Sequence, residues 1–166
     1  MKVPRLSAMP LATTDPAPEI PELLERIDAL LARGGDVLFF RERELYHITD
    51  LVNRDTREHV RFVVGLSLLI RVFEYRYSKL TGNMLEALSH LLAQNVRIYA
   101  YPMSSRDLQQ VIQSISATDW QWTDSNGWVS ADQLHLAPPL GHLYDYVLAS
   151  NFLVPMPIPA ELTAGP

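Results

Sequence analysis

The stretch Asn95–Arg106, NVRIYAYPMSSR, holds the side chains best placed to do chemistry. Its first half is typical of a buried strand, and Ser104 or Ser105 is suited to cap a helix that follows. The N–H groups at a helix start favour an anion, and Ser104, Ser105 and Arg106 add side-chain donors. Ligands of open parallel sheets bind beyond the carboxyl ends of strands. The turn thus predicts a site for a small anion or a nucleotide, although helix capping alone explains the same serines.

Arg41 is the second cation that this site would use. It follows the apolar run DVLFF at residues 36–40, which predicts a strand. If that strand and the one at residues 96–101 are parallel, Arg41 and Arg106 emerge at the same edge of the sheet. No glycine-rich phosphate loop supports the site, because RGGD at residues 33–36 has the composition of a helix stop.

Other catalytic arrangements find little support. His142 and Asp145 stand one helical turn apart and His135 precedes them, but the prolines between the two histidines give no recognised metal-ligand spacing. A Ser-His-Asp hydrolase would need a nucleophile elbow such as G-x-S-x-G, which the sequence lacks. We therefore expect no catalytic residue, no metal and no cofactor, and the sequence favours a protein that is not an enzyme without deciding the question.

Composition excludes further classes of function. The 166 residues contain no cysteine, which removes disulfides, thiolate metal sites and any thiol nucleophile. The net charge is −5, and residues 81–166 hold all of this excess because they carry 2 basic and 7 acidic side chains. This charge argues against nucleic-acid binding. The longest apolar run, residues 62–70, is too short to span a membrane, and we expect a cytoplasmic protein.

Periodicity predicts the elements that must position these residues. Helical spacing of leucine and isoleucine marks helices over residues 19–33, 81–94 and 104–115, and a last helix over 141–152. The run FVVGLSLLI at residues 62–70 favours a helix that is apolar all round, with Asp55 and Glu58 as a capping-box pattern ahead of it. Residues 41–50 fit either a strand or a helix.

This order predicts an α/β fold, a single three-layer domain in which helices flank a mainly parallel sheet. We place the domain at residues 19–150, between a Pro-rich N-terminal segment, 1–18, and a Pro-rich C-terminal tail, 151–166. An aromatic-rich C-terminal extension begins after Ser116, with a Ser-Asn-Gly turn between two short strands.

The segment NMLEALSHLLAQNVRIYAYPMSS resembles the DsrE-type sulfur-relay family, in which a helix leads into a strand of the form GVKIYACxMS. ALLARGGDVLFF is similar to that family's second strand. The family's cysteine, which carries persulfide sulfur, corresponds to Tyr101, and a phenol cannot form a persulfide. The resemblance thus implies a retained scaffold without the sulfur chemistry, and it implies assembly into homo- or hetero-oligomers.

Two functions stay open from the sequence. The first is a non-enzymatic interaction or assembly subunit of a larger protein complex. Its expected contact residues are aromatic: Phe73, Tyr75, Tyr77, Trp120, Trp122 and Trp128. The alternative is a binding protein or transferase that holds a small anion or a nucleotide at the strand ends. The sequence names neither the partner nor the ligand.

Overall fold

The computed structural model describes residues 6–10, 20–33, 36–40, 44–55, 58–74, 83–92 and 95–159. The chain divides into two compact units, residues 1–48 and 49–166, which are described separately. This division differs from the boundaries at residues 18 and 150 that the Pro-rich ends suggest. None of the helices in the described ranges is long and apolar enough to cross a membrane.

The first unit contains one β–α–β motif. Strands β1 (Leu6–Pro10) and β2 (Asp36–Phe40) pair in parallel, and helix α1 (Ile20–Leu31) connects them. A parallel pair needs such a crossover because its two strands start at the same end. Helix α2 (Leu45–Asp55) begins in this unit and ends in the second. The ambiguous segment before residue 50 is therefore helical from Leu45 onward.

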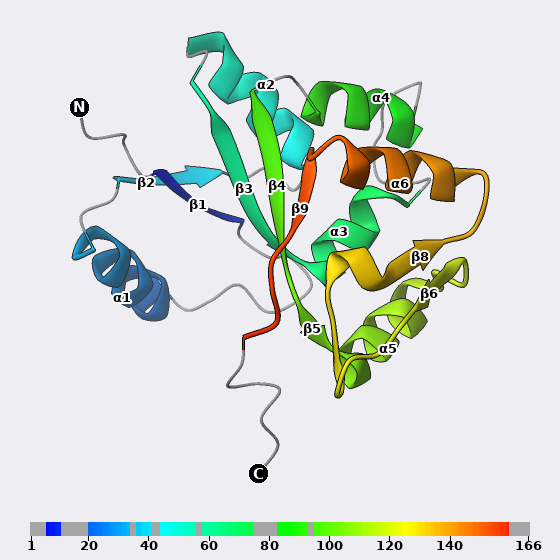
Figure 1. The fold of residues 1–166 in the computed structure, drawn as a ribbon. Helices are drawn as coiled ribbons and strands as arrows, with labels where there is room; N and C mark the ends of the chain where they lie inside the picture. The colour runs from blue at the N-terminus through cyan, green and yellow to red at the C-terminus, as the bar shows by residue number, and fades with distance from the viewer. Residues whose placement is uncertain are drawn as a thin grey trace. The chain divides into compact units, whose positions relative to one another are not determined.

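The second unit is built on a parallel sheet of three strands in the order β3 (Val60–Gly65), β4 (Val96–Tyr101) and β9 (Leu153–Pro155). Its further helices are α3 (Leu66–Val72), α4 (Asn83–Leu91), α5 (Ser105–Ile115) and α6 (Leu140–Ala149). Figure 1 shows α4 and α6 beside the three strands. A mainly parallel sheet with helices confirms the predicted α/β class.

The apolar run at residues 62–70 is a strand followed by a helix, and the prediction of one helix over it was wrong. Phe62 and Val64 are buried while Arg61 and Val63 are exposed, which is the period-two alternation of a strand. Gly65 is extended and is the N-cap residue of α3. The expected capping box was also wrong, because Asp55 ends α2 and Glu58 lies in the bend before β3.

Two antiparallel ribbons follow β4. Strand β5 (Met103–Ser104) pairs with β7 (Trp128–Val129), and β6 (Trp120–Trp122) pairs with β8 (Leu134–Leu136) after the 3₁₀ turn η1 (Ala131–Gln133). Asn126 and Gly127 both have positive φ, as a two-residue hairpin turn requires. The expected turn is therefore present, although the strands on either side of it pair with other strands.

Three aromatic rings pack edge to face in the core of the second unit. The ring of Tyr144 on α6 lies 5.1 Å from the ring of Phe73 and 5.2 Å from that of Trp120, measured between centroids. The hydroxyl of Tyr144 donates a hydrogen bond of 2.7 Å to the carbonyl of Ala131. These contacts join α3, α6, β6 and η1 through one buried cluster.

Strand β9 lies inside the segment predicted as a Pro-rich tail. The N–H of Ile98 donates to the carbonyl of Phe152, and the N–H of Met156 donates to that of Ala100. In a parallel ladder these bonds alternate along the strand, so the N–H positions of residues 153 and 155 point away from β4. Pro155 has no N–H to expose there, and Pro157 and Pro159 continue the same alternation.

Candidate functional site

The strand-to-helix turn at which the sequence predicts an anion site is present at the start of α5. Strand β4 ends at Tyr101, and β5 leads directly into α5, whose N-cap is Ser104. The hydroxyl of Ser104 accepts a hydrogen bond of 3.1 Å from the N–H of Asp107. The N–H of Ser105 donates to the carbonyl of Gly127 at 2.8 Å. Two backbone N–H donors of the predicted site, those of Ser105 and Asp107, are therefore already in use.

A carboxylate of the same chain lies where the sequence places an external anion. The hydroxyl of Ser105 donates to one carboxylate oxygen of Asp124, and the N–H of Gly127 donates to the other at 2.6 Å. These hydrogen bonds, that of Ser105 first, lower the pKa of Asp124. Asp124 stands 19 residues after Ser105, and nothing in the local sequence links the two.

Arg41 and Arg106 are the two cations of the predicted site. Arg106 is exposed on the first turn of α5. Arg41 lies outside the described residues. The convergence of the two guanidinium groups stays a prediction.

The lowered pKa of Asp124 predicts a specific dependence of stability on acid. A carboxyl whose pKa is lower in the folded than in the unfolded chain stabilises the fold above its ordinary pKa near 4, and this contribution is lost as the pH falls through the lowered pKa. Asp124→Asn should therefore unfold at a lower temperature than the wild type at about pH 6, with the difference shrinking towards about pH 2. Thermal unfolding across this range measures it. Ser105→Ala should reproduce the effect, and a difference that stays constant with pH would contradict the assignment.

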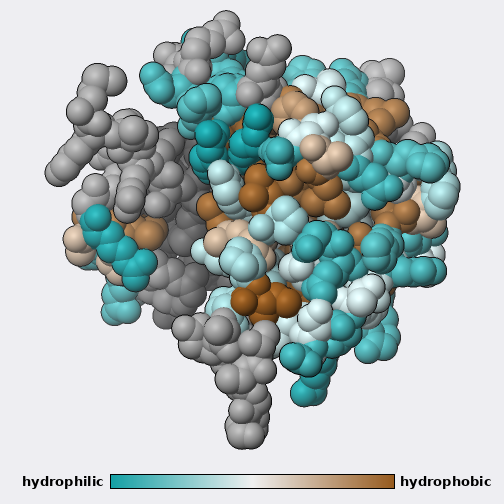
Figure 2. Space-filling model, in the orientation of Figure 1, coloured by the Kyte–Doolittle hydropathy of each residue, from teal (hydrophilic) through white to brown (hydrophobic). Residues whose placement is uncertain are grey.

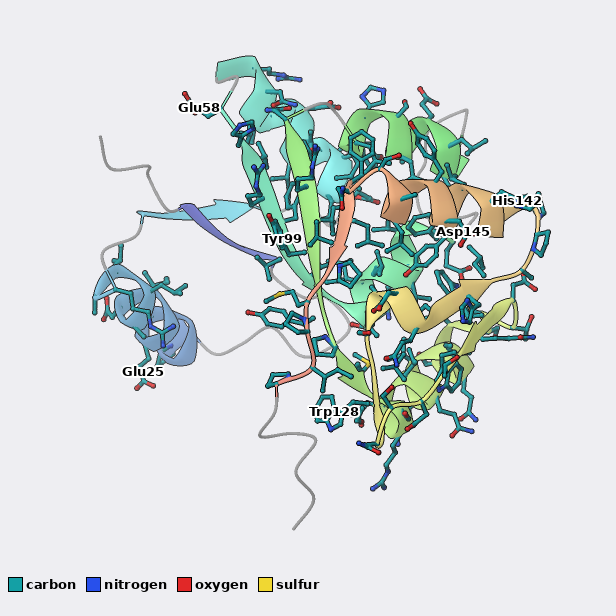
Figure 3. The ribbon with its side chains drawn as sticks, viewed as in Figure 1. Glu25, Glu58, Tyr99, Trp128, His142 and Asp145 are labelled. Carbon is teal, nitrogen blue, oxygen red and sulfur yellow. The ribbon has the colours of Figure 1, made fainter. Side chains whose placement is uncertain are left out.

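The histidines whose spacing matches no metal-ligand pattern lie on two different elements. His135 is exposed on β8, and His142 and Asp145 are exposed on α6. Figure 3 labels His142 and Asp145 on this helix. In the described residues no three His, Asp or Glu side chains are grouped so as to hold a metal ion.

Glu74 is the carboxyl in the described ranges with a raised pKa. Burial raises it first, and the negative charge of Asp119 adds to the effect. A raised pKa is one property of a carboxyl that serves as a general acid. No hydrogen bond to a nucleophile or a base accompanies it in the described residues, so the geometry gives it no reaction to serve.

An open hollow of about 270 Å³ lies between η1 and the chain that follows β9. Its lining residues are Ser130, Asp132, Gln133, Pro155, Met156, Pro157 and Ile158. The polar side chains on one wall already bond to each other: the side-chain carbonyl of Gln133 accepts from both the N–H and the hydroxyl of Ser130. This internal bonding makes the wall a capping box, a structural role that needs no ligand.

One face of the parallel sheet exposes apolar side chains. Val63 on β3 is 54% exposed and Tyr101 on β4 is 51% exposed. Tyr99, which pairs with Val63, and Val154, which pairs with Tyr99, are half-buried. The opposite face, with Phe62, Val64, Val96, Ile98, Ala100 and Leu153, is buried in the core.

Figures 2 and 3 show the same surface. Hydrophobic side chains are exposed over β9 and the region next to it, with hydrophilic ones around them (Figure 2). Tyr99 points away from α6 (Figure 3). At one end of the face, the guanidinium of Arg97 stacks on the ring of Phe152, 5.1 Å from the centroid. We refer to Val63, Tyr99, Tyr101, Val154 and Met156 as the open face.

The aromatic residues expected to contact a partner have mixed positions. Phe73 and Trp120 are buried, 2% and 4% exposed, and serve the core cluster with Tyr144 instead of a surface. Trp122 and Trp128 are half-buried. Tyr75 and Tyr77 lie outside the described residues. The open face was not predicted from the sequence, although the alternation in VRFVV and VRIYAY marks it, because both segments are dominated by apolar residues.

Comparison with known proteins gives no further guidance. No protein-family model matches the chain, and neither a curated protein nor a solved structure matches it. The resemblance to DsrE-type proteins stays a prediction.

Proposed function

We propose that this chain is a non-enzymatic interaction subunit that assembles with other protein chains through the open face of its parallel sheet. Tyr101 is part of this face. If the resemblance to sulfur-relay proteins reflects common descent, the position of the sulfur-carrying cysteine has become a contact position.

The observation that carries the proposal is the exposure of Val63 and Tyr101 on a parallel sheet. Parallel sheets are normally covered on both faces, because their crossover connections place chain on each side. Here one face is buried and the other shows apolar side chains that are about half exposed. Such a patch, bordered by polar residues, is typical of a protein interaction surface.

The alternative, an anion-binding protein, has less support from the geometry. An incoming phosphate at the start of α5 would have to displace the carboxylate of Asp124 from the hydroxyl of Ser105 and from the N–H of Gly127. The carboxylate also adds a negative charge that repels the ligand. The start of α5 is therefore better described as a structural contact between this helix and the turn that contains Asp124 and Gly127.

The experiment is to express tagged chain in its own host and to quantify the proteins that co-purify with it. Tyr101→Lys should lower the recovered partner about tenfold or more, because aromatic side chains at the centre of interfaces often contribute 2 kcal/mol or more to binding. A lysine also places a hydrated charge on a surface that must lose its water.

Tyr146→Lys is the matched control. Tyr146 is 59% exposed on α6 and does not belong to the open face. Its replacement introduces the same charge in a similarly exposed place and should leave the recovery unchanged. Equal recovery with wild type, Tyr101→Lys and Tyr146→Lys would contradict the proposal.

A further inference from the structure

The two edges of the three-stranded sheet differ in whether they offer hydrogen bonds. On β9 the outward position 155 is a proline, and prolines follow at 157 and 159. A strand that approaches this edge would find few N–H donors, which is a common protection against strand addition.

Strand β3 has no such protection. The N–H of Val60 donates to the carbonyl of Asn95 on the β4 side, so residues 60, 62 and 64 bond to β4 and residues 61, 63 and 65 direct their backbone groups outward. Among the described strands β3 pairs only with β4. Arg61, Val63 and Gly65 all retain their N–H groups, so this edge can accept a further strand.

We propose that the edge strand β3 pairs with β3 of a second copy of this chain. The two strands would run antiparallel, related by a two-fold axis that passes between Val63 and its copy. This inference rests on the proposed function and names one of its partners. The pairing would join two three-stranded sheets into one of six strands. Two-fold pairing of identical edges is the simplest closed assembly.

The sequence of β3 is complementary to itself in this register. Val63 would face its own copy, and Phe62 would face Val64 of the partner subunit on the core side of the sheet. Arg61 would face the partner subunit's Gly65, so the strand's single charged residue meets no like charge. Its guanidinium also lies back over its own sheet, within 3.2 Å of the carbonyl of Val60 and 3.4 Å of that of Asn95.

Single cysteines test both the partner and the register, because the chain has none of its own. Val63→Cys should form a disulfide-linked dimer under mild oxidation, since directly opposed Cα atoms lie about 5.5 Å apart, inside disulfide range. Arg61→Cys alone should not, because residue 61 and its copy are offset by four positions, or about 13 Å.

The mixed pair gives the decisive result. Arg61→Cys and Gly65→Cys should cross-link with each other when the two purified variants are combined, although neither does so alone. A side chain at position 65 has room, since the nearest atom to an added Cβ is the hydroxyl oxygen of Ser67 at 3.9 Å. Equal cross-linking of all combinations would show random collision and overturn the register.

Val63→Pro tests the backbone hydrogen bonds proposed between the two copies of β3. It removes an outward N–H that β4 does not use, and it should convert a dimer to a monomer in native mass spectrometry, whereas Val63→Thr should remain dimeric. A wild-type monomer, or a dimer that survives Val63→Pro, overturns the self-pairing. In either case, the proposed function would still hold if the wild-type chain recovered a different protein as its partner and Tyr101→Lys lowered that recovery.

Discussion

Replacement of Gly141 by alanine is expected to destabilise the second unit by about 3 kcal/mol or more, at the upper end of the range for overpacked sites. An added Cβ would overlap the carbonyl oxygen of Leu136 and lie 3.2 Å from its carbonyl carbon. Both atoms belong to the backbone, so no side-chain rotation relieves the contact. Either α6 or β8 must move, and α6 carries the buried Tyr144. Chemical denaturation followed by tryptophan fluorescence measures the loss.

Gly65→Ala is the control for this prediction. Gly65 is an extended residue with open space around it, because the nearest atom to its added Cβ lies 3.9 Å away. The same chemical change should therefore alter the free energy of unfolding by less than about 1 kcal/mol. Similar losses for the two variants would mean that α6 is not packed against the backbone of Leu136.

Loss of the Tyr144 side chain is expected to have the second large effect. Tyr144→Ala removes a fully buried ring from between Phe73 and Trp120 and should cost about 3–5 kcal/mol. Tyr144→Phe keeps the ring and removes only the hydroxyl, which leaves the carbonyl of Ala131 without that donor. Its cost should be smaller, about 1–3 kcal/mol.

The pH dependence of stability distinguishes the contribution of the Tyr144 hydroxyl from that of its ring. Burial raises the pKa of Tyr144 well above its ordinary value, and the charges of Asp132 and Asp145 add to this. The unfolded chain releases this proton above about pH 10 and the folded chain retains it, so wild-type stability should fall as the pH rises beyond that point. The stability of Tyr144→Phe should not show this part of the decline with rising pH. A spectroscopic titration in which every tyrosine of the folded protein ionises near pH 10 would contradict the buried hydrogen bond.

Local patterns were sufficient for the elements with clear periodicity. The sequence of β4 followed by α5 predicted the strand and a cap at Ser104 or Ser105, of which Ser104 is the N-cap residue, and helical spacing located α4 and α6. The prediction for residues 62–70 was wrong because the strand half and the helix half of this run are both apolar. The alternation of buried Phe62 and Val64 is too short to distinguish a strand from part of a longer helix.

Long-range pairing could not be inferred from the sequence. Strand β9 consists of three residues among prolines, and it forms only because β4 supplies the hydrogen-bonding edge. The contact of Ser105 with Asp124 has the same origin, since the two residues lie 19 positions apart and no local pattern pairs them. Aromatic side chains are common both in cores and at interfaces, and the sequence does not show which of them are buried. The buried residues Phe73 and Trp120 were therefore assigned to a surface.

Native mass spectrometry of the chain isolated from its own host shows whether the protein is a subunit of a larger assembly. We expect species whose masses are sums of several chains, among them a dimer of the 18.8 kDa protein. Assemblies that lack the dimer but contain other proteins would keep the subunit role and exclude the β3 pairing. A single 18.8 kDa chain, alone or with a small bound molecule, would contradict the proposed function.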